Sequence, residues 1–413
     1  MYGRTDYIMW YHGLFGNSKK ARKALEYYGG FEELYEVVTK NADTKGLLKG
    51  FDRQRLTSFS LFDATDCIET CRDIGGDVIT FESPYYPQRL LEISDYPFIL
   101  FYQGDKEALR ETVRVAVVGS RNADNDALAL SYNASYNLAK TGAVIVSGAA
   151  MGIDTAAHKG AIAAGGMTVG VLGCGLGSAY MDRIGGFYKE VCRNGVYITE
   201  LLPLTDPSRF TFPERNRLIS GMSDAVLVTY AGEKSGSLIT ASAAKKQKRQ
   251  VYAVPSELYP SDGCNALLTD GAASFTKAGD IAYLFRDRYK GRFDEEYCNV
   301  PVEAGNVSED AYGLTAEDKK QPSLQKTESS VKKKTEKKAP PPVKKEAETK
   351  KELPDSVSEA AKSIYSVLLG GKRDVNSLVD MTGLPVRAVL TAVAELEIFG
   401  FIRNLPGAVV EII

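Results

Sequence analysis

The stretch "SRFTFPERNR" combines two residue types that bind nucleic acid. Three arginines, Arg209, Arg215 and Arg217, are interleaved with Phe210 and Phe212 over nine positions. Guanidinium groups neutralise phosphates and aromatic rings stack on bases, so their alternation suits a flexible single strand. The chemistry that this pattern predicts is the binding of a sugar–phosphate chain.

Four turns rich in small residues have a second anion-binding pattern. They read "GSRNAD", "SGAAMGID", "GCGLGS" and "YAGEKSGSLIT", and each follows an apolar run. The first includes Arg121, and the last includes Lys234, Ser235 and Ser237. A glycine at a strand-to-helix turn is often only a tight turn, but free N–H groups at a helix start attract phosphate. Because four such turns are expected at one sheet edge, we favour a phosphate-binding role.

The arginine and phenylalanine pattern also has a purely structural interpretation. In it Phe212 belongs to the core, and Arg215 and Arg217 pair with Asp224 or Glu214. For each residue alone the two interpretations are about equally good. For the whole cluster, beside four phosphate-like turns, nucleic acid is favoured.

Candidate catalytic residues are scarce. His158 lies in an alanine-rich helical pattern, where a structural role is expected, and Asp154 stands where it would cap a helix. The sequence has no Ser/His/Asp arrangement, no Walker lysine, no paired acids and no metal-binding set. We therefore expect no catalytic site, no metal and no cofactor. The cysteines are expected to be reduced and buried; they are Cys67, Cys71, Cys174, Cys192, Cys264 and Cys298.

The elements that hold these residues alternate between strand and helix. The runs "VRVAVVG", "AVIVSG", "MTVGVLG", "GVYITEL", "AVLVTY" and "QVYAVP" are apolar on successive residues, as strands are when helices cover both sheet faces. Helical patterns such as "NDALALSYNASYNLAKT" separate them. This rhythm predicts an α/β fold with a doubly wound parallel sheet, whose ligands bind at the carboxyl ends of the strands.

The chain divides into four expected regions. Residues 1–112 form a helical domain and a connecting segment, and residues 113–286 form the sheet domain. Residues 287–354 form a disordered linker rich in Lys and Pro, because the stretch 319–351 has twelve Lys against four Glu and few large apolar residues. Residues 355–413 form a winged helix, with Gly383 in the turn of a helix-turn-helix pattern. No run is long enough to span a membrane and no secretory signal is evident, so a cytoplasmic protein is expected.

The motifs together resemble one family. "VAVVGSR", "SGAAMGIDTAAHKGA", "FPERNRLISGMSD", "KSGSLITASAA", "VYAVP" and "GCNALLTDGA" resemble DNA-processing protein A (DprA, also called Smf) in order and spacing. The resemblance covers roughly residues 113–281. It implies an extended Rossmann fold that binds single-stranded DNA, preceded by a SAM-like or helix-hairpin-helix domain and followed by a winged helix. It also implies a homodimer that protects incoming single strands during natural transformation and helps to load the RecA recombinase, without enzymatic activity.

The resemblance also assigns candidate DNA-binding residues. Arg121 would grip phosphate beside Gly119 and Ser120, and Arg209 stands where the family has a basic residue ahead of "FP-x-RN". The remaining candidates are the pocket floor and its walls: Ser147, Gly148, Gly152, Ile153, Phe212, Arg215, Asn216, Lys234, Ser235, Gly236 and Ser237. The sequence departs from the family after the third strand, where Asp182 replaces a basic residue and Arg183 follows, and at Tyr230, which replaces Glu.

Two other functions are compatible with parts of the sequence. A nucleoside monophosphate phosphoribohydrolase would use a similar sheet, but such enzymes have "PGGxGT" where this chain has "GEKSGSLIT". A transcription regulator would read DNA with the winged helix. The second helix of that domain, "PVRAVLTAVAELEIF", has Arg387 as its one basic residue and two Glu, whereas a groove reader usually has more positive charge. We therefore interpret the winged helix as a protein-interaction module.

Overall fold

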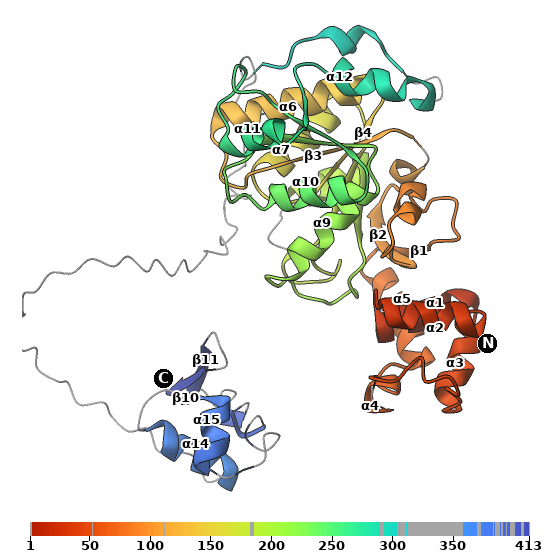
Figure 1. Ribbon diagram of the computed structural model, residues 1–413, viewed down its shortest axis with the longest axis vertical. Coiled ribbons are helices and arrows are strands. Elements are labelled where there is room, and N and C mark those ends of the chain that lie inside the picture. The colour runs from red at the N-terminus through yellow and green to blue at the C-terminus, as the bar shows by residue number, and fades with distance from the viewer. Residues whose placement is uncertain are drawn as a thin grey trace, which may run out of the picture. The chain divides into compact units, whose positions relative to one another are not determined.

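The structure is a computed structural model, and its described residues fall in two compact units (Figure 1). The units are Met1–Gln325 and Lys326–Ile413. The described residues are 2–51, 53–110, 112–181, 186–289, 293–303, 305, 311, 358–369, 373–382, 384, 389, 391–393, 395–396, 401–405 and 409–412. Most of the predicted linker lies outside them.

A mixed sheet forms the centre of the first unit. Its strands in the described part of the chain are β1 (Asp77–Thr80), β2 (Ile99–Gly104), β3 (Arg114–Gly119), β4 (Val144–Ser147), β5 (Thr168–Val171), β6 (Gly195–Thr199), β7 (Ala225–Tyr230), β8 (Gln250–Ala253) and β9 (Ala273–Ser274). Their order is β1-β2-β6-β5-β4-β3-β7-β8-β9. The strands from β3 to β9 are parallel, and the chain reverses its direction of winding between β3 and β7. The predicted α/β doubly wound sheet is confirmed, and the six predicted strands correspond to β3–β8.

One edge of the sheet is antiparallel, which the sequence did not predict. β1 and β2 form an antiparallel hairpin from the connecting segment, and β2 pairs antiparallel with β6. Ile99, Leu100 and Phe101 of β2 are fully buried, so their apolar side chains favour joining the sheet over remaining in a surface connection.

Helices cover both faces of the sheet. Val115 and Val117 of β3 share one cluster with α6 (Asn125–Lys140) and α7 (Ile153–Ala163). Ala116 and Val118 share another with α9 (Thr211–Gly221) and α10 (Ser237–Lys246). Successive side chains of a strand point to opposite faces, so a strand that is apolar at every position is buried on both. The remaining helices of this part are α8 (Gly186–Asn194), α11 (Asp262–Thr269) and α12 (Gly279–Ala282).

The N-terminal helices share a core with the sheet. They are α1 (Arg4–Phe15), α2 (Lys19–Tyr28), α3 (Phe31–Thr39), α4 (Arg53–Leu56) and α5 (Leu61–Asp73). The buried rings of Trp10, Tyr11 and Phe31 belong to the same cluster as Phe101 of β2. Two glycines separate α2 from α3. The first of them, Gly29, has a φ of 99°, which favours glycine.

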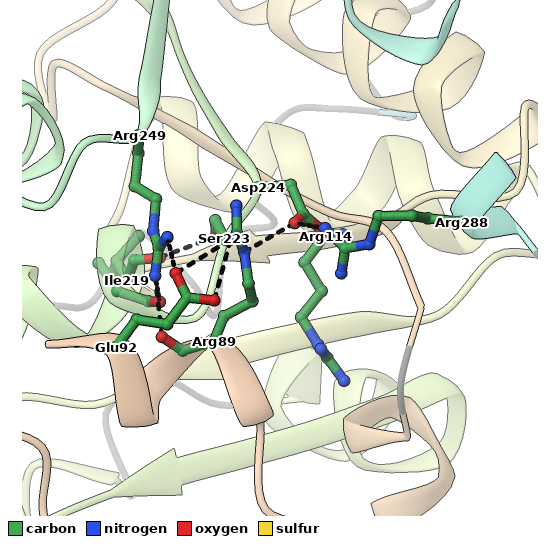
Figure 2. A network of polar contacts seen from close by, with 9 residues as sticks. Arg89, Glu92, Arg114, Ile219, Ser223, Asp224, Arg249 and Arg288 are labelled. Carbon is green, nitrogen blue, oxygen red and sulfur yellow. Dashed lines mark hydrogen bonds and ion pairs between the residues drawn. The ribbon is translucent and has the colours of Figure 1, made fainter. Parts of the chain in front are cut away.

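A charged network holds the connecting segment at the amino edge of the parallel strands (Figure 2). The buried carboxylate of Asp224, just before β7, lies 2.9 Å from Arg89 Nε and accepts a hydrogen bond from Arg288. Arg89 belongs to the short 3-10 helix η1 (Gln88–Glu92). Glu92 forms one ion pair with Arg89 and a second with Arg249, which precedes β8. The network therefore lies at the opposite edge from the glycine-rich turns.

Part of the predicted linker, and the unit that follows it, are also described. Tyr289, Cys298 and Val302, which the sequence assigned to the linker, are fully buried beside α6 and α12. They belong to or flank η4 (Tyr283–Tyr289) and η5 (Glu296–Asn299). The second unit has α14 (Glu359–Leu368), β10 (Arg373–Asp374), α15 (Val375–Thr382), β11 (Ile402–Leu405) and β12 (Val409–Ile412). β11 and β12 pair antiparallel. No helix within the described ranges has the length and apolar character that crossing a membrane requires.

Candidate functional site

Three of the glycine-rich turns meet at the carboxyl edge of the sheet. The N–H of Ser120, in the turn after β3, donates to the carbonyl of Tyr230 at the end of β7 over 2.9 Å. The N–H of Ile153 donates to the carbonyl of Ser120 over 3.2 Å. The turns after β3, β4 and β7 therefore form one continuous surface at the point where the sheet changes its winding direction, which is where open α/β sheets bind ligands.

Two glycines make this close approach possible. A Cβ on Gly119 would lie 2.7 Å from the carbonyl oxygen of Tyr230. Gly152 has a φ of 83°, and a Cβ there would lie 2.5 Å from the carbonyl oxygen of Ser120. Since backbone atoms cannot move aside as a flexible side chain can, glycine is required at both positions. The side chain of Ile153 is fully buried beneath Gly119, so this predicted site residue supports the turn from inside.

The turn after β5 is directed toward a different loop. The N–H of Gly175 donates to the carbonyl of Thr205, and that of Gly177 donates to the carbonyl of Pro203, each over 2.8 Å. These N–H groups are therefore occupied by the loop that follows β6. Gly173 leaves room for the ring of Phe212, whose nearest atom would be 2.8 Å from a Cβ at that position. This turn therefore shapes the site, but its two N–H groups are already bonded and are not available to an anion.

The space behind the turn after β4 is filled by Arg215. Its guanidinium donates to the carbonyls of Gly148 and Val171, and the residue is 5% exposed. A Cβ on Gly148 would lie 2.5 Å from Asp154 Oδ2 and 2.8 Å from Arg215 Nη2, so any other residue there would displace these two side chains. Ser147 is also inside, because its hydroxyl donates to the carbonyl of Val117 over 2.6 Å.

Burial changes the proton affinity of this inner pair. Loss of solvent lowers the pKa of Arg215 to about 10, with the carboxylate of Asp154 opposing the shift. Burial likewise raises the pKa of Asp154, with Arg215 opposing that shift. The Arg215 guanidinium stays charged at neutral pH, and the Asp154 carboxyl group shares the buried space under the turn with it.

Two predicted arginines lie on the surface against aromatic rings. The guanidinium carbon of Arg121 lies 4.9 Å from the ring centroid of Phe212, and that of Arg209 lies 4.7 Å from the ring centroid of Phe210. Phe210 is 62% exposed. Within the described ranges neither arginine has a carboxylate at ion-pair distance. Phe212 is partly covered, because the ring of Tyr180 lies 6.1 Å away.

The remaining predicted residues gather at the start of α10. The hydroxyls of Ser235 and Ser237 lie 2.8 Å apart, and Lys234 is exposed. A Cβ at Gly236 would meet nothing within 4 Å, so the surface is open there. Asn216 accepts from Arg215 Nε over 3.2 Å and donates to the carbonyl of Gly236 over 3.5 Å. It thus links the inner arginine to the turn after β7.

Arg217, the third arginine of the sequence pattern, does not belong to the exposed site. Arg217 is held by Glu200 and by Asp95, the latter over 3.3 Å. The structural interpretation was right that Arg217 pairs with carboxylates, although neither is Asp224 or Glu214. Arg183 lies outside the described residues. Phe210 was part of the sequence pattern but was not predicted as a site residue. The signal in the sequence was its position next to Arg209, and the structure adds that its ring is exposed.

The described residues offer no assembled catalytic group. His158 is fully buried, and its Nδ1 lies 2.6 Å from Thr168 Oγ1. Burial lowers the pKa of His158 to about 3, so the ring is neutral at neutral pH. No group of three or more His, Cys, Asp or Glu side chains in the described ranges is placed to hold a metal ion. The cysteines are free, and four of them are buried.

Comparisons with known proteins match both units of the chain. A family model described as DNA recombination-mediator protein A matches residues 77–286, and one described as DprA winged helix domain matches residues 348–408. The chain is 36% identical over 212 residues to the DNA processing protein DprA of Bacillus subtilis, covering 51% of this chain and 71% of that protein. It is 39% identical over 202 residues to the DNA processing protein DprA of Streptococcus pneumoniae, covering 48% and 71%. The X-ray structure of the DprA from Streptococcus pneumoniae superposes with a TM-score of 0.57 and 30% identity, covering 68% of this chain and 97% of that one.

Proposed function

Because the chain belongs to the DNA recombination-mediator protein A family, we propose that the carboxyl edge of its sheet binds single-stranded DNA. The observation that carries the proposal is the pair of exposed guanidinium groups, Arg121 and Arg209, each stacked on a phenylalanine. Phosphates would contact the arginines and bases would stack on the rings, a combination that tolerates any sequence.

The inner residues support this surface from below. Arg215 would add positive potential beneath the strand without leaving its carbonyl partners. Lys234 and the serines at the start of α10 would supply further phosphate contacts, since the helix start adds a positive dipole end. The affinity should therefore depend strongly on salt and little on sequence.

The test is a double variant, Arg121→Gln with Arg209→Gln, titrated with oligothymidylate and a mixed-sequence strand at several salt concentrations. We expect roughly a tenfold or larger loss for both strands, and a salt slope reduced by about 0.7 for each lost phosphate contact. A matched control is Arg193→Gln with Arg286→Gln, which removes two exposed arginines elsewhere on the same unit. Binding of the site variant that equals wild type would overturn the proposal.

The family also suggests what the bound strand is for. We propose that the protein protects incoming single strands in the cytoplasm, acts as a homodimer and helps to load the RecA recombinase. Light scattering would measure the mass of the particle. Nuclease protection and RecA filament growth on a coated strand would measure the other two activities, and each should fail in the double arginine variant.

We further propose that the protein breaks no bond in the strand or in a nucleotide. In the described part of the chain the histidine nearest the site is buried and neutral, and Asp154 is enclosed with Arg215. Incubation with nucleoside monophosphates should therefore release no free base. Turnover at ordinary enzyme rates would favour the phosphoribohydrolase function instead.

A further inference from the structure

We infer that lysines at the start of α2 form a second phosphate-binding surface that continues the proposed strand site onto the N-terminal helices. This inference rests on the proposed function. It concerns Lys19, Lys20 and Lys23, which are all exposed. Among the described residues none of the three has a carboxylate within ion-pair distance. These residues lie outside the segment that the family model matches.

Lys19 and Lys20, in the first turn of α2, do not serve the stability of that helix. A helix start has a partial positive charge, and a cation there costs about 0.3–1 kcal/mol rather than stabilising the helix. The first turn of α2 has no acidic residue, and its cap is the neutral Ser18 hydroxyl, which accepts from the N–H of Ala21 over 3.3 Å. These lysines have no carboxylate partner among the described residues and weaken the start of the helix. An anionic partner that binds them would account for their presence there.

The α1–α2 turn lies at the same edge of the sheet as the proposed site. Asn17 Nδ2 donates to the carboxylate of Glu200 over 2.6 Å, and His12 Nε2 lies 2.6 Å from the carbonyl oxygen of Glu200. Glu200 directly follows the carboxyl end of β6. The loop that begins there leads to Arg209, and Glu200 also binds Arg217 of α9. The first turn of α2 therefore begins two residues from a direct contact with the edge that presents the exposed arginines.

A second segment joins the α2 lysines. Lys20 Nζ would lie 3.3 Å from a Cβ on Gly50, and it lies 6.0 Å from the ring centroid of Phe51. Lys49 is exposed beside them, with no carboxylate partner in the described ranges. The half-buried ring of Phe51 thus lies under a cation, as the rings of Phe210 and Phe212 do at the sheet edge. The same chemistry, cations above aromatic rings, recurs at both places and suits the backbone of the same kind of strand.

The test compares strand lengths in the full chain. The triple variant Lys19→Gln, Lys20→Gln, Lys23→Gln should bind an oligothymidylate of roughly 6 nucleotides as wild type does, because that strand is confined to the sheet edge. For one of roughly 30 nucleotides, its affinity should fall several-fold at physiological salt. The salt slope should fall by about 2, or about 0.7 for each lysine that contacts a phosphate. A matched control is Lys106→Gln, Lys246→Gln, Lys248→Gln, which removes three charges beside the opposite edge of the sheet.

The outcomes separate this inference from the function on which it rests. If wild type binds no single strand, the proposed function fails. If wild type binds and the α2 variant matches it in affinity and salt slope on the long strand, only the α2 surface is refuted. An equal loss in the control triple variant would also refute it, because the effect would then be one of total charge. Thermal unfolding of each variant verifies that the fold is kept, and the dipole argument predicts a melting temperature of the α2 variant no lower than that of wild type.

Discussion

Arginine has two different tasks at the sheet edge, and the structure separates them by burial. Arg121 and Arg209 are exposed and lie on aromatic rings, so a phosphate can reach them. Arg215 is buried, and its planar fork donates to two carbonyl oxygens of neighbouring turns. The sequence does not distinguish the three arginines, because the residue type alone does not predict which side chains will be buried.

This difference predicts opposite responses to lysine. Arg121→Lys should keep the free energy of unfolding and most of the strand affinity, because a phosphate accepts a compact ammonium as well. Arg215→Lys should lower the free energy of unfolding by about 2 kcal/mol, because an ammonium cannot reproduce the fork and leaves a buried carbonyl unsatisfied. Urea unfolding and strand titration of the two variants would measure both effects. A stable Arg215→Lys protein would show that the fork is not needed to hold the turns.

At the scale of elements, the sequence predicted what depends on local pattern. The strands β3–β8 are apolar at every position and are bounded by Gly, Pro or Asp, so their existence and their parallel pairing followed from the sequence. β2 was missed, because "YPFILFYQG" is short, follows several prolines and pairs with β6, which is distant in sequence. β1 was missed because it has only four residues and, among the described strands, pairs only with β2. The meeting of three turns was predictable from the common sheet edge. The filling of the inner turn by Arg215 was not, because it depends on a contact between residues 67 positions apart.

The charged network at the amino edge joins several elements of the first unit through one carboxylate (Figure 2). The Asp224 carboxylate is fully buried and receives Arg89, Arg288 and the N–H of Arg114, the last over 2.9 Å. It thus joins the starts of β3 and β7 to η1 and η4. Asp224→Asn would remove the buried charge that the partly exposed guanidinium groups of Arg89 and Arg288 share, so we expect a loss of about 3 kcal/mol in the free energy of unfolding.

A nearby carboxylate offers the control for that measurement. Glu92 binds Arg89 and Arg249 in the same network, but its side chain is 50% exposed. The buried Arg249 guanidinium also donates to the carbonyls of Arg89 and Gly221, so it keeps two partners without Glu92. Solvent screens such a pair, so Glu92→Gln should cost no more than about 1 kcal/mol. Urea unfolding of the two variants should separate them clearly. Equal losses would contradict the prediction that the buried carboxylate contributes more stability than the exposed one.

At the scale of the whole molecule, two separate segments match the family. They are residues 77–286, which include the whole sheet edge, and residues 348–408 of the winged helix. The candidate phosphate-binding residues of the sheet edge all lie in the first segment, and the lysines of α2 precede it. The expected recognition helix of the second has Arg387 as its one basic residue, against Glu395 and Glu397. The charge distribution therefore favours the division that we propose, with strand binding by the first unit and a protein partner for the winged helix.

A chain that ends at Gln325 tests this division, because it removes the second unit and keeps the first intact. Single-strand affinity at physiological salt should stay within about twofold of the full chain, since the phosphate contacts that set it are retained. A second chain that lacks only residues 319–351 separates the lysine-rich segment from the winged helix. If both chains lose affinity alike, the lysines bind the strand directly and the segment is more than a tether. If only the chain ending at Gln325 loses affinity, the winged helix itself contacts DNA, and its assignment to a protein partner is wrong.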